Sequence, residues 1–149
     1  MQQFDLASLI WAAGGIALLV WLAGGFLSSV GGQWRDRDRT IDLVQLGPWV
    51  WGTCQINGGT QRYRGKVWLG DLSLTRRDFG RQHLLALGFN EVQAKYVEGQ
   101  VMVRLSLKLQ EGTLRGHLSG TRFQFNPRTQ QVLSVQSTPA EQRSWTRLG

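Results

Sequence analysis

The residues in this sequence with the most evident chemistry are cations gathered on one short segment. Residues 62–69 read RYRGKVWL, and a β-strand places alternate side chains on opposite faces. One face then carries cations and a tryptophan, whereas the other carries apolar core residues. Three arginines follow closely and can extend the cationic face. Arginine binds carboxylate or phosphate through forked hydrogen bonds. The pattern therefore predicts a site for an anionic partner, formed by Arg62, Arg64, Lys66, Trp68, Arg76, Arg77 and Arg81.

Residues that could support catalysis or bind a metal are few and poorly spaced. His83 and His117 have no companion carboxylate at local spacing; we expect His83 to be half-buried and His117 to face solvent. Asp71 and Asp78 are explained by turn and helix-capping roles. The sequence has no phosphate-binding glycine loop, no Gly-x-Ser-x-Gly turn and no helix with two histidines. We therefore expect a protein without catalytic activity, cofactor or metal.

The single cysteine, Cys54, excludes an intramolecular disulfide and a cysteine-based zinc cluster. It lies in an alternating apolar segment, so we expect a small core residue rather than a reactive thiol. A dyad of Cys54 with His83 would require the fold to bring the two together, which the sequence does not indicate.

An uncharged interval between Asp5 and Arg35 is the most distinctive element of the chain. It contains an apolar run at residues 8–30, and about 20 helical residues cross a hydrocarbon core of about 30 Å. We therefore predict an N-terminal segment at residues 1–32 that includes a transmembrane helix at about residues 8–30. A cleavable signal peptide is the alternative. It is disfavoured because the first six residues lack Lys and Arg and the apolar run exceeds a secretory h-region.

Small residues lie along one face of this predicted helix. Ala13, Ala17, Gly24 and Ser28 share that face when each residue advances by about 100°. In lipid, small residues let a second helix approach closely, although Gly and Ala are also common in membrane helices generally. The stripe predicts docking with other transmembrane subunits.

The flanks of the apolar run predict its orientation. Arg35, Arg37 and Arg39 follow the run and nothing basic precedes it, so the positive-inside rule places the C-terminal domain in the cytoplasm of a single-pass protein. An extracytoplasmic domain is the alternative. Trp34, just beyond the run, has the position of an interfacial aromatic.

The rest of the chain predicts a mainly β domain. We expect a juxtamembrane connector at residues 33–48, a β-rich domain at 49–136 and an irregular tail at 137–149. Alternating segments separated by short turns predict a meander of seven short strands. Thr75 and Gly88 are placed to begin and end one helix at residues 75–87, after which residues 91–96 alternate as in a strand. The fold class is an N-terminal transmembrane helix followed by a β-meander, small barrel or two-layer domain with one inserted helix.

The charge balance is consistent with an anionic partner. Seventeen Lys and Arg against ten Asp and Glu give a net charge of +7, although charge that only keeps the domain soluble is the alternative explanation. We predict a non-enzymatic membrane subunit whose helix docks in a larger membrane assembly and whose β domain is an interaction or scaffolding module at the membrane face. The alternative is a module that binds anionic lipid or another anionic ligand; an enzyme with a site assembled across strands is least favoured. Nucleic acid is not favoured, because no recognition helix or stacking signature accompanies the charge.

Overall fold

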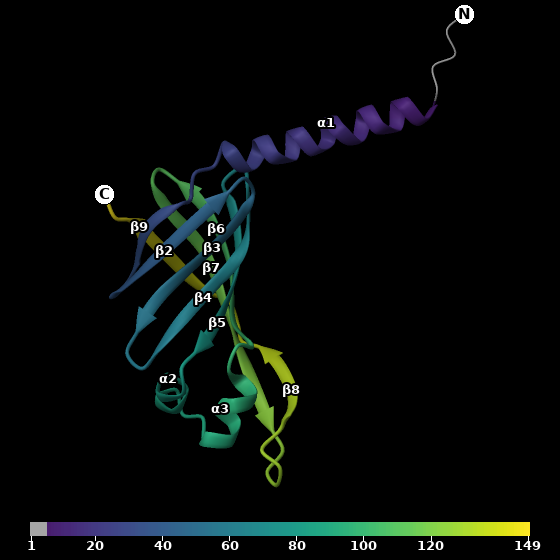
Figure 1. Cartoon of the computed structure of the whole chain (residues 1–149). Coiled ribbons are helices and arrows are strands. Elements are labelled where there is room, and N and C mark those ends of the chain that lie inside the picture. Colours follow the sequence, from purple (N-terminus) through teal and green to yellow (C-terminus); the bar gives the residue numbers. More distant parts are fainter. Residues whose placement is uncertain (1–5) are drawn as a thin grey trace, which may run out of the picture.

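A closed antiparallel β-barrel forms the body of the protein in the computed structural model, which describes residues 6–149 (Figure 1). Strands β1 to β6 pair in chain order, β6 pairs with β7, β7 with β9, and β9 with β1, so eight strands close a ring. The strands are β1 (Gly32–Asp36), β2 (Arg39–Leu46), β3 (Trp49–Ile56), β4 (Gly59–Trp68), β5 (Asp71–Phe79), β6 (Val101–Gln110), β7 (Thr113–Phe125), β8 (Val132–Ser137) and β9 (Glu141–Arg147). Strand β8 pairs with the end of β7 and stands outside the ring.

Alternate side chains from each strand fill the interior of the barrel, as the pleat of a β-strand requires. Three aromatic residues occupy its centre: Trp34 and Trp145 are fully buried and Tyr63 is 4% exposed. The rings of Tyr63 and Trp145 meet edge to face with their centroids 5.8 Å apart. Aliphatic side chains such as Leu72 and Leu114 complete the core around them.

Two strand glycines allow neighbouring strands to approach closely. A Cβ atom added to Gly65 of β4 would overlap the carbonyl oxygen of Ser73 on β5. A Cβ atom on Gly116 of β7 would overlap the carbonyl oxygen of Ser106 on β6 in the same way. Glycine in a strand interior is typical of such close backbone contacts in a barrel.

Two short helices lie at the end of the barrel away from the N-terminal helix (Figure 1). Helix α2 (Arg81–Ala86) follows β5, and helix α3 (Glu91–Val97) precedes β6. A capping box begins α3: the Asn90 side chain accepts hydrogen bonds from the backbone of Val92 and Gln93, and the Gln93 side chain accepts one from Asn90 N. The helix start is therefore specified locally.

Helix α1 (Leu6–Phe26) projects away from the barrel and contacts it only near its C-terminal end, within the described residues (Figure 1). The rings of Trp21 and Trp49 meet edge to face with centroids 4.6 Å apart. The Leu69 backbone donates a hydrogen bond to Gly24 O at 3.4 Å, and the ring of Trp68 packs against Gly24. In the part of the chain that the structure describes, no helix combines the length and the apolar character that a membrane crossing requires.

The prediction of a mainly β domain with an inserted helix is confirmed, and the small barrel is the correct choice among the predicted β architectures. The predicted connector at residues 33–48 is wrong, because those residues form most of β1 and β2. The predicted irregular tail is also wrong, since β9 lies within it and closes the ring through pairing with β1 and β7. Trp34 is a core residue and not an interfacial aromatic.

The predicted helix at residues 75–87 is wrong in its first half. Residues 75–79 belong to β5, and helix α2 begins only at Arg81, after Gly80 turns the chain with a φ of 110°. Residues 91–96, predicted as a strand, form α3 instead. The capping pattern at Thr75 led to a predicted helix start that is too early. The short alternation at residues 91–96 resembles that of a strand, although these residues form a helix.

Candidate functional site

The outward face of β3, β4 and β5 gathers the cations singled out in the sequence. Antiparallel pairing arranges them in cross-strand rows: Trp49 lies beside Lys66, Trp51 beside Arg64, and Arg62 beside Arg77. Arg64, Lys66 and the two arginines of the third row are exposed. These rows line a broad open groove, and we call this surface the cationic face; its members are Trp49, Trp51, Arg62, Arg64, Lys66, Thr75, Arg77 and Phe79.

Aromatic rings hold two of these cations in place. The guanidinium carbon of Arg62 lies 4.5 Å from the centroid of the Phe79 ring, and Lys66 Nζ lies 5.3 Å from that of Trp49. Such contacts orient a cation without neutralising its charge. Both side chains therefore remain available to an anion from solution or from a surface.

No acidic residue lines the described groove, which contains four Lys and Arg side chains. Among the ion pairs of the described residues, none includes Arg62, Arg64 or Lys66. Like charges placed directly opposite on neighbouring strands are destabilising unless an anion lies between them. The cationic face therefore carries positive charge that no acidic side chain in its groove offsets.

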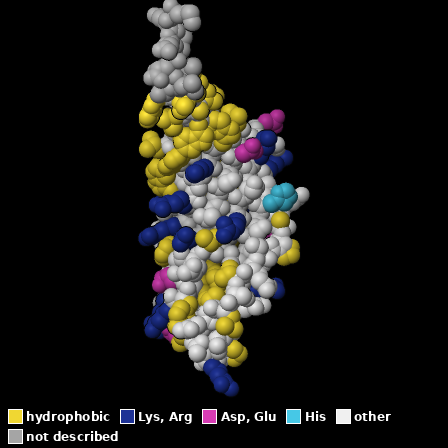
Figure 2. All heavy atoms as spheres, turned by 90° about the vertical axis from the view of Figure 1, so that its right-hand side faces the viewer, with side chains coloured by type: hydrophobic (Ala, Val, Ile, Leu, Met, Phe, Trp, Pro, Cys, Tyr) yellow, Lys and Arg dark blue, Asp and Glu magenta, His cyan; other side chains and the backbone are white. Residues whose placement is uncertain are grey.

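An apolar band borders the cationic face on the side nearest α1. Val44 and Leu46 on β2 are 53% and 68% exposed, and they pair with Trp51 and Trp49 on β3. Leu69, in the turn after β4, is 58% exposed. Figure 2, viewed from the side toward which α1 projects, shows an apolar region that includes α1 and Lys and Arg side chains below it on the same side. The band therefore places exposed apolar side chains beside the cations on one side of the barrel.

The structure separates the seven residues predicted to bind an anion. Arg62, Arg64, Lys66 and Arg77 share the cationic face, and Trp68 faces outward at its upper edge, packed on α1. The other two do not belong to it. Arg76 points into the barrel, and Arg81 on α2 forms an ion pair with Glu91 of α3.

Sequence reasoning missed four residues of this surface: Trp49, Trp51, Phe79 and Thr75, the last of which was assigned as a helix cap. Trp49 and Trp51 alternate with buried Val50, and that alternation after Pro48 was the available signal for two outward tryptophans. Phe79 was assigned to a helical arc, although it lies on the outward side of β5 beneath Arg62. Its position became evident only once β5 was known to extend that far.

The four small residues of the N-terminal stripe have two different surroundings. Ala13 and Ala17 are exposed along α1. Gly24 packs on Trp68, and Ser28, which lies beyond the end of α1, is 5% exposed. Half of the predicted docking stripe therefore already contacts or lies close to the barrel.

A second polar cluster closes the far end of the barrel, where α2 packs against β4 and β5. Asp78 is fully buried and accepts hydrogen bonds from Arg76 Nε at 2.8 Å and from Gln61 Nε2 at 3.3 Å. His83 Nε2 lies 2.9 Å from Asp78 Oδ2. The predicted capping role of Asp78 is therefore wrong, because its carboxylate is the centre of a buried network. His83 is more deeply buried than predicted, at 7% exposure, and its ring has a polar partner.

Two other titratable groups, Cys54 and Tyr63, are buried in the barrel. Cys54 is 1% exposed, which confirms that it is a core residue. His117, in contrast, is exposed as predicted. Burial raises the pKa of the Cys54 thiol and raises the pKa of the Tyr63 hydroxyl strongly. Both groups thus stay neutral in the folded protein at pH values where the unfolded chain ionises.

Alkaline pH should therefore destabilise the barrel through these two groups. In the unfolded chain they ionise near their ordinary pKa values of about 8.5 and about 10. Because the folded-state pKa values are higher, the contribution of these two neutral groups to stability is fully present below about pH 8.5 and is lost progressively as the pH rises. We expect the Tm of the full chain to fall less between pH 8 and pH 11 in the variant C54S/Y63F than in the unaltered protein. Equal slopes for the two proteins would contradict this coupling.

A metal site gains no support from the described residues. No group of three or more His, Cys, Asp and Glu side chains among them could hold a metal ion. Comparison of the chain with protein-family models, with curated proteins and with solved structures finds no match.

Proposed function

We propose that this protein is a non-enzymatic, membrane-anchored module whose cationic face lies on an anionic lipid surface. The observation that carries the proposal is the cationic face itself, with cations held over neutral aromatic rings and no acidic residue in its groove. As part of the same proposal, the uncharged interval between Asp5 and Arg35 would provide a single-pass anchor beside it, although α1 within the described residues does not by itself reach the length and apolar character of a crossing helix. The β-barrel would act as an interaction module at the membrane face.

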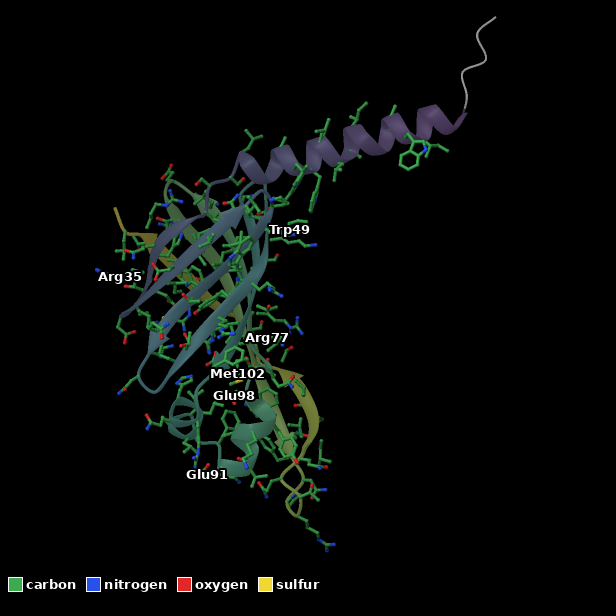
Figure 3. The ribbon with its side chains drawn as sticks, viewed as in Figure 1. Arg35, Trp49, Arg77, Glu91, Glu98 and Met102 are labelled. Carbon is green, nitrogen blue, oxygen red and sulfur yellow. The ribbon has the colours of Figure 1, made fainter. Side chains whose placement is uncertain are left out.

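The placement of α1 supports this proposal. Trp49 and Arg77 lie on the side of the barrel toward which α1 projects, and Arg35 lies on the other side (Figure 3). A helix that enters a bilayer along its normal would thus bring the cationic face toward the headgroups. The contact between Trp21 and Trp49 would lie at the junction of helix and face.

The exposed side chains of α1 favour lipid as its surroundings. Ile10 is 67% exposed, Trp11 82% and Leu19 67%, and Ile16 and Leu18 are exposed by more than half. Fully burying an aliphatic side chain of this size stabilises a protein by about 1.5–3 kcal/mol relative to exposure. A hydrocarbon layer would provide that burial on every side of the helix.

A distance measurement in nanodiscs tests the proposal with the full chain. Ser73 borders the cationic face beside Lys66, whereas Ser144 lies on β9, across the ring from β4, and both are exposed. In a C54S background, we expect a fluorophore at S73C to transfer energy to headgroup-labelled lipid more efficiently in anionic than in neutral nanodiscs. Added salt should reverse the increase, because each cation near the surface contributes about 1 kcal/mol that salt screens. A fluorophore at S144C should show no such increase.

A charge-removal variant provides the matched control. The variant R62Q/R64Q/K66Q should abolish most of the increase at S73C, whereas R115Q/R122Q/R128Q removes three exposed cations elsewhere and should retain it. Equal transfer in anionic and neutral nanodiscs would overturn the proposal. So would equal loss in the two triple variants, because binding would then follow net charge rather than this face.

The orientation and the helix contacts remain part of the proposal. Arg35, Arg37 and Arg39 favour a cytoplasmic domain by the positive-inside rule. Docking of α1 in a larger membrane assembly is a second candidate function. It is favoured by the exposed Ala13 and Ala17, where a second helix could approach closely.

A further inference from the structure

Two arginines of the cationic face are held side by side by neutral groups. Arg62 on β4 and Arg77 on β5 are direct cross-strand neighbours. Arg62 packs on the Phe79 ring, and Arg77 Nη1 donates a hydrogen bond to Gly99 O at 2.7 Å. Glu98, which precedes Gly99 in the chain, accepts a hydrogen bond from Gly80 N instead. Neither guanidinium forms an ion pair among the described residues.

Two unpaired guanidinium side chains on neighbouring strands favour one anion of high charge. Directly opposed like charges repel, and the ring and the carbonyl that orient them do not cancel either charge. Two guanidinium groups can offer forked hydrogen bonds to a single group with several acceptor oxygens. A phosphomonoester carries a charge of about −1.5 to −2 and three terminal oxygens, whereas a phosphodiester carries one charge and two such oxygens.

We infer that Arg62 and Arg77 form a clamp for the terminal phosphomonoester of a lipid headgroup. The inference rests on the proposed function, since it names the lipid that the cationic face prefers. The lipid source follows from the position of the pair, because Arg77 lies on the side of the barrel toward which α1 projects (Figure 3) and the apolar band borders the same cationic face. Arg64 and Lys66 then attract any anionic headgroup, and the clamp supplies the preference for a phosphomonoester over a phosphodiester.

Titration with short-chain lipids tests the clamp in the full chain, held in micelles of a neutral detergent. We expect dihexanoyl phosphatidic acid, a phosphomonoester, to bind about ten-fold more tightly by calorimetry than dihexanoyl phosphatidylglycerol, a diester; this corresponds to about 1.4 kcal/mol. The variant R62K/R77K keeps both charges and loses the forks, and it should bind the two lipids within about two-fold of each other. The matched variant R64K should keep the ten-fold preference. Thermal unfolding of each variant controls for folding.

The outcomes separate the clamp from the broader proposal. Equal affinity for the two lipids in the unaltered protein, or an undiminished preference in R62K/R77K, overturns the clamp, while the salt-sensitive energy transfer at S73C would still support the cationic face. Loss of both the preference for phosphatidic acid and the salt-sensitive energy transfer overturns the clamp and the proposed function together. Inorganic phosphate is the third arm: competition by it at the affinity of phosphatidic acid would identify a soluble phosphate compound as the ligand and overturn the lipid assignment.

Discussion

Replacing Asp78 with asparagine should destabilise the barrel by about 3–5 kcal/mol, because removing one partner of a buried ion pair leaves the other charge unpaired. The Asp78 carboxylate is fully buried and accepts hydrogen bonds from Arg76 and Gln61, and it also contacts His83. Asparagine keeps the size of the side chain but supplies no charge for Arg76. Thermal unfolding of the full chain should show a fall in Tm of about 10 °C or more.

Asp71 is the matched control for this prediction. Its carboxylate lies at the start of the same strand, 3.7 Å from Lys108 Nζ, with 68% of the side chain exposed. Exposed ion pairs contribute about 0–1 kcal/mol, so D71N should leave the Tm nearly unchanged. A D78N variant as stable as D71N would show that the buried network contributes little to the barrel.

Replacing Gly65 with alanine should destabilise the barrel by at least about 2 kcal/mol, because the added methyl group meets backbone rather than a mobile side chain. The carbonyl of Ser73 that it would overlap belongs to the β4–β5 ladder, so relief requires the two strands to separate. Chemical denaturation of the full chain should show a lower midpoint and an unchanged slope.

Gly31 provides the control for this substitution. A Cβ atom there would lie 3.8 Å from its nearest neighbours, which is ordinary van der Waals contact. We expect G31A to change the free energy of unfolding by less than about 0.5 kcal/mol. Equal effects of G65A and G31A would mean that close strand approach at β4 and β5 is not required.

The cationic strand could be predicted because its pattern has a period of two. Arg62, Arg64 and Lys66 alternate with core residues in β4, as the sequence indicated. The prediction failed at the next element, where Thr75 and Asp78 resembled a capping box. In a strand, adjacent residues face opposite sides, so Arg76 turns inward to Asp78 while Arg77 turns outward. A helix would have left both arginines on the surface.

The closing strand could not be read from the sequence. Strand β9 has the sequence EQRSWTR, in which Trp145 is the single apolar residue. Strand formation there depends on two partners far away in the chain, β1 and β7, and local patterns carry no information about such pairing. Only part of the cationic face could be predicted for the same reason. Its tryptophans and Phe79 come to lie beside the cations through cross-strand pairing.

The ring is closed by the strand that is synthesised last among the nine. Strand β1 directly follows α1, yet its partner β9 must be made before Trp34 can pair with Arg147. Arg147 then ties this end together by donating to Ser29 O at 2.6 Å and packing on the Trp34 ring. Pairing across so much of the chain carries an entropic cost of loop closure and is typical of slow folding. If α1 enters a membrane during synthesis, the barrel must close afterwards, beside the bilayer on which its cationic face is proposed to lie.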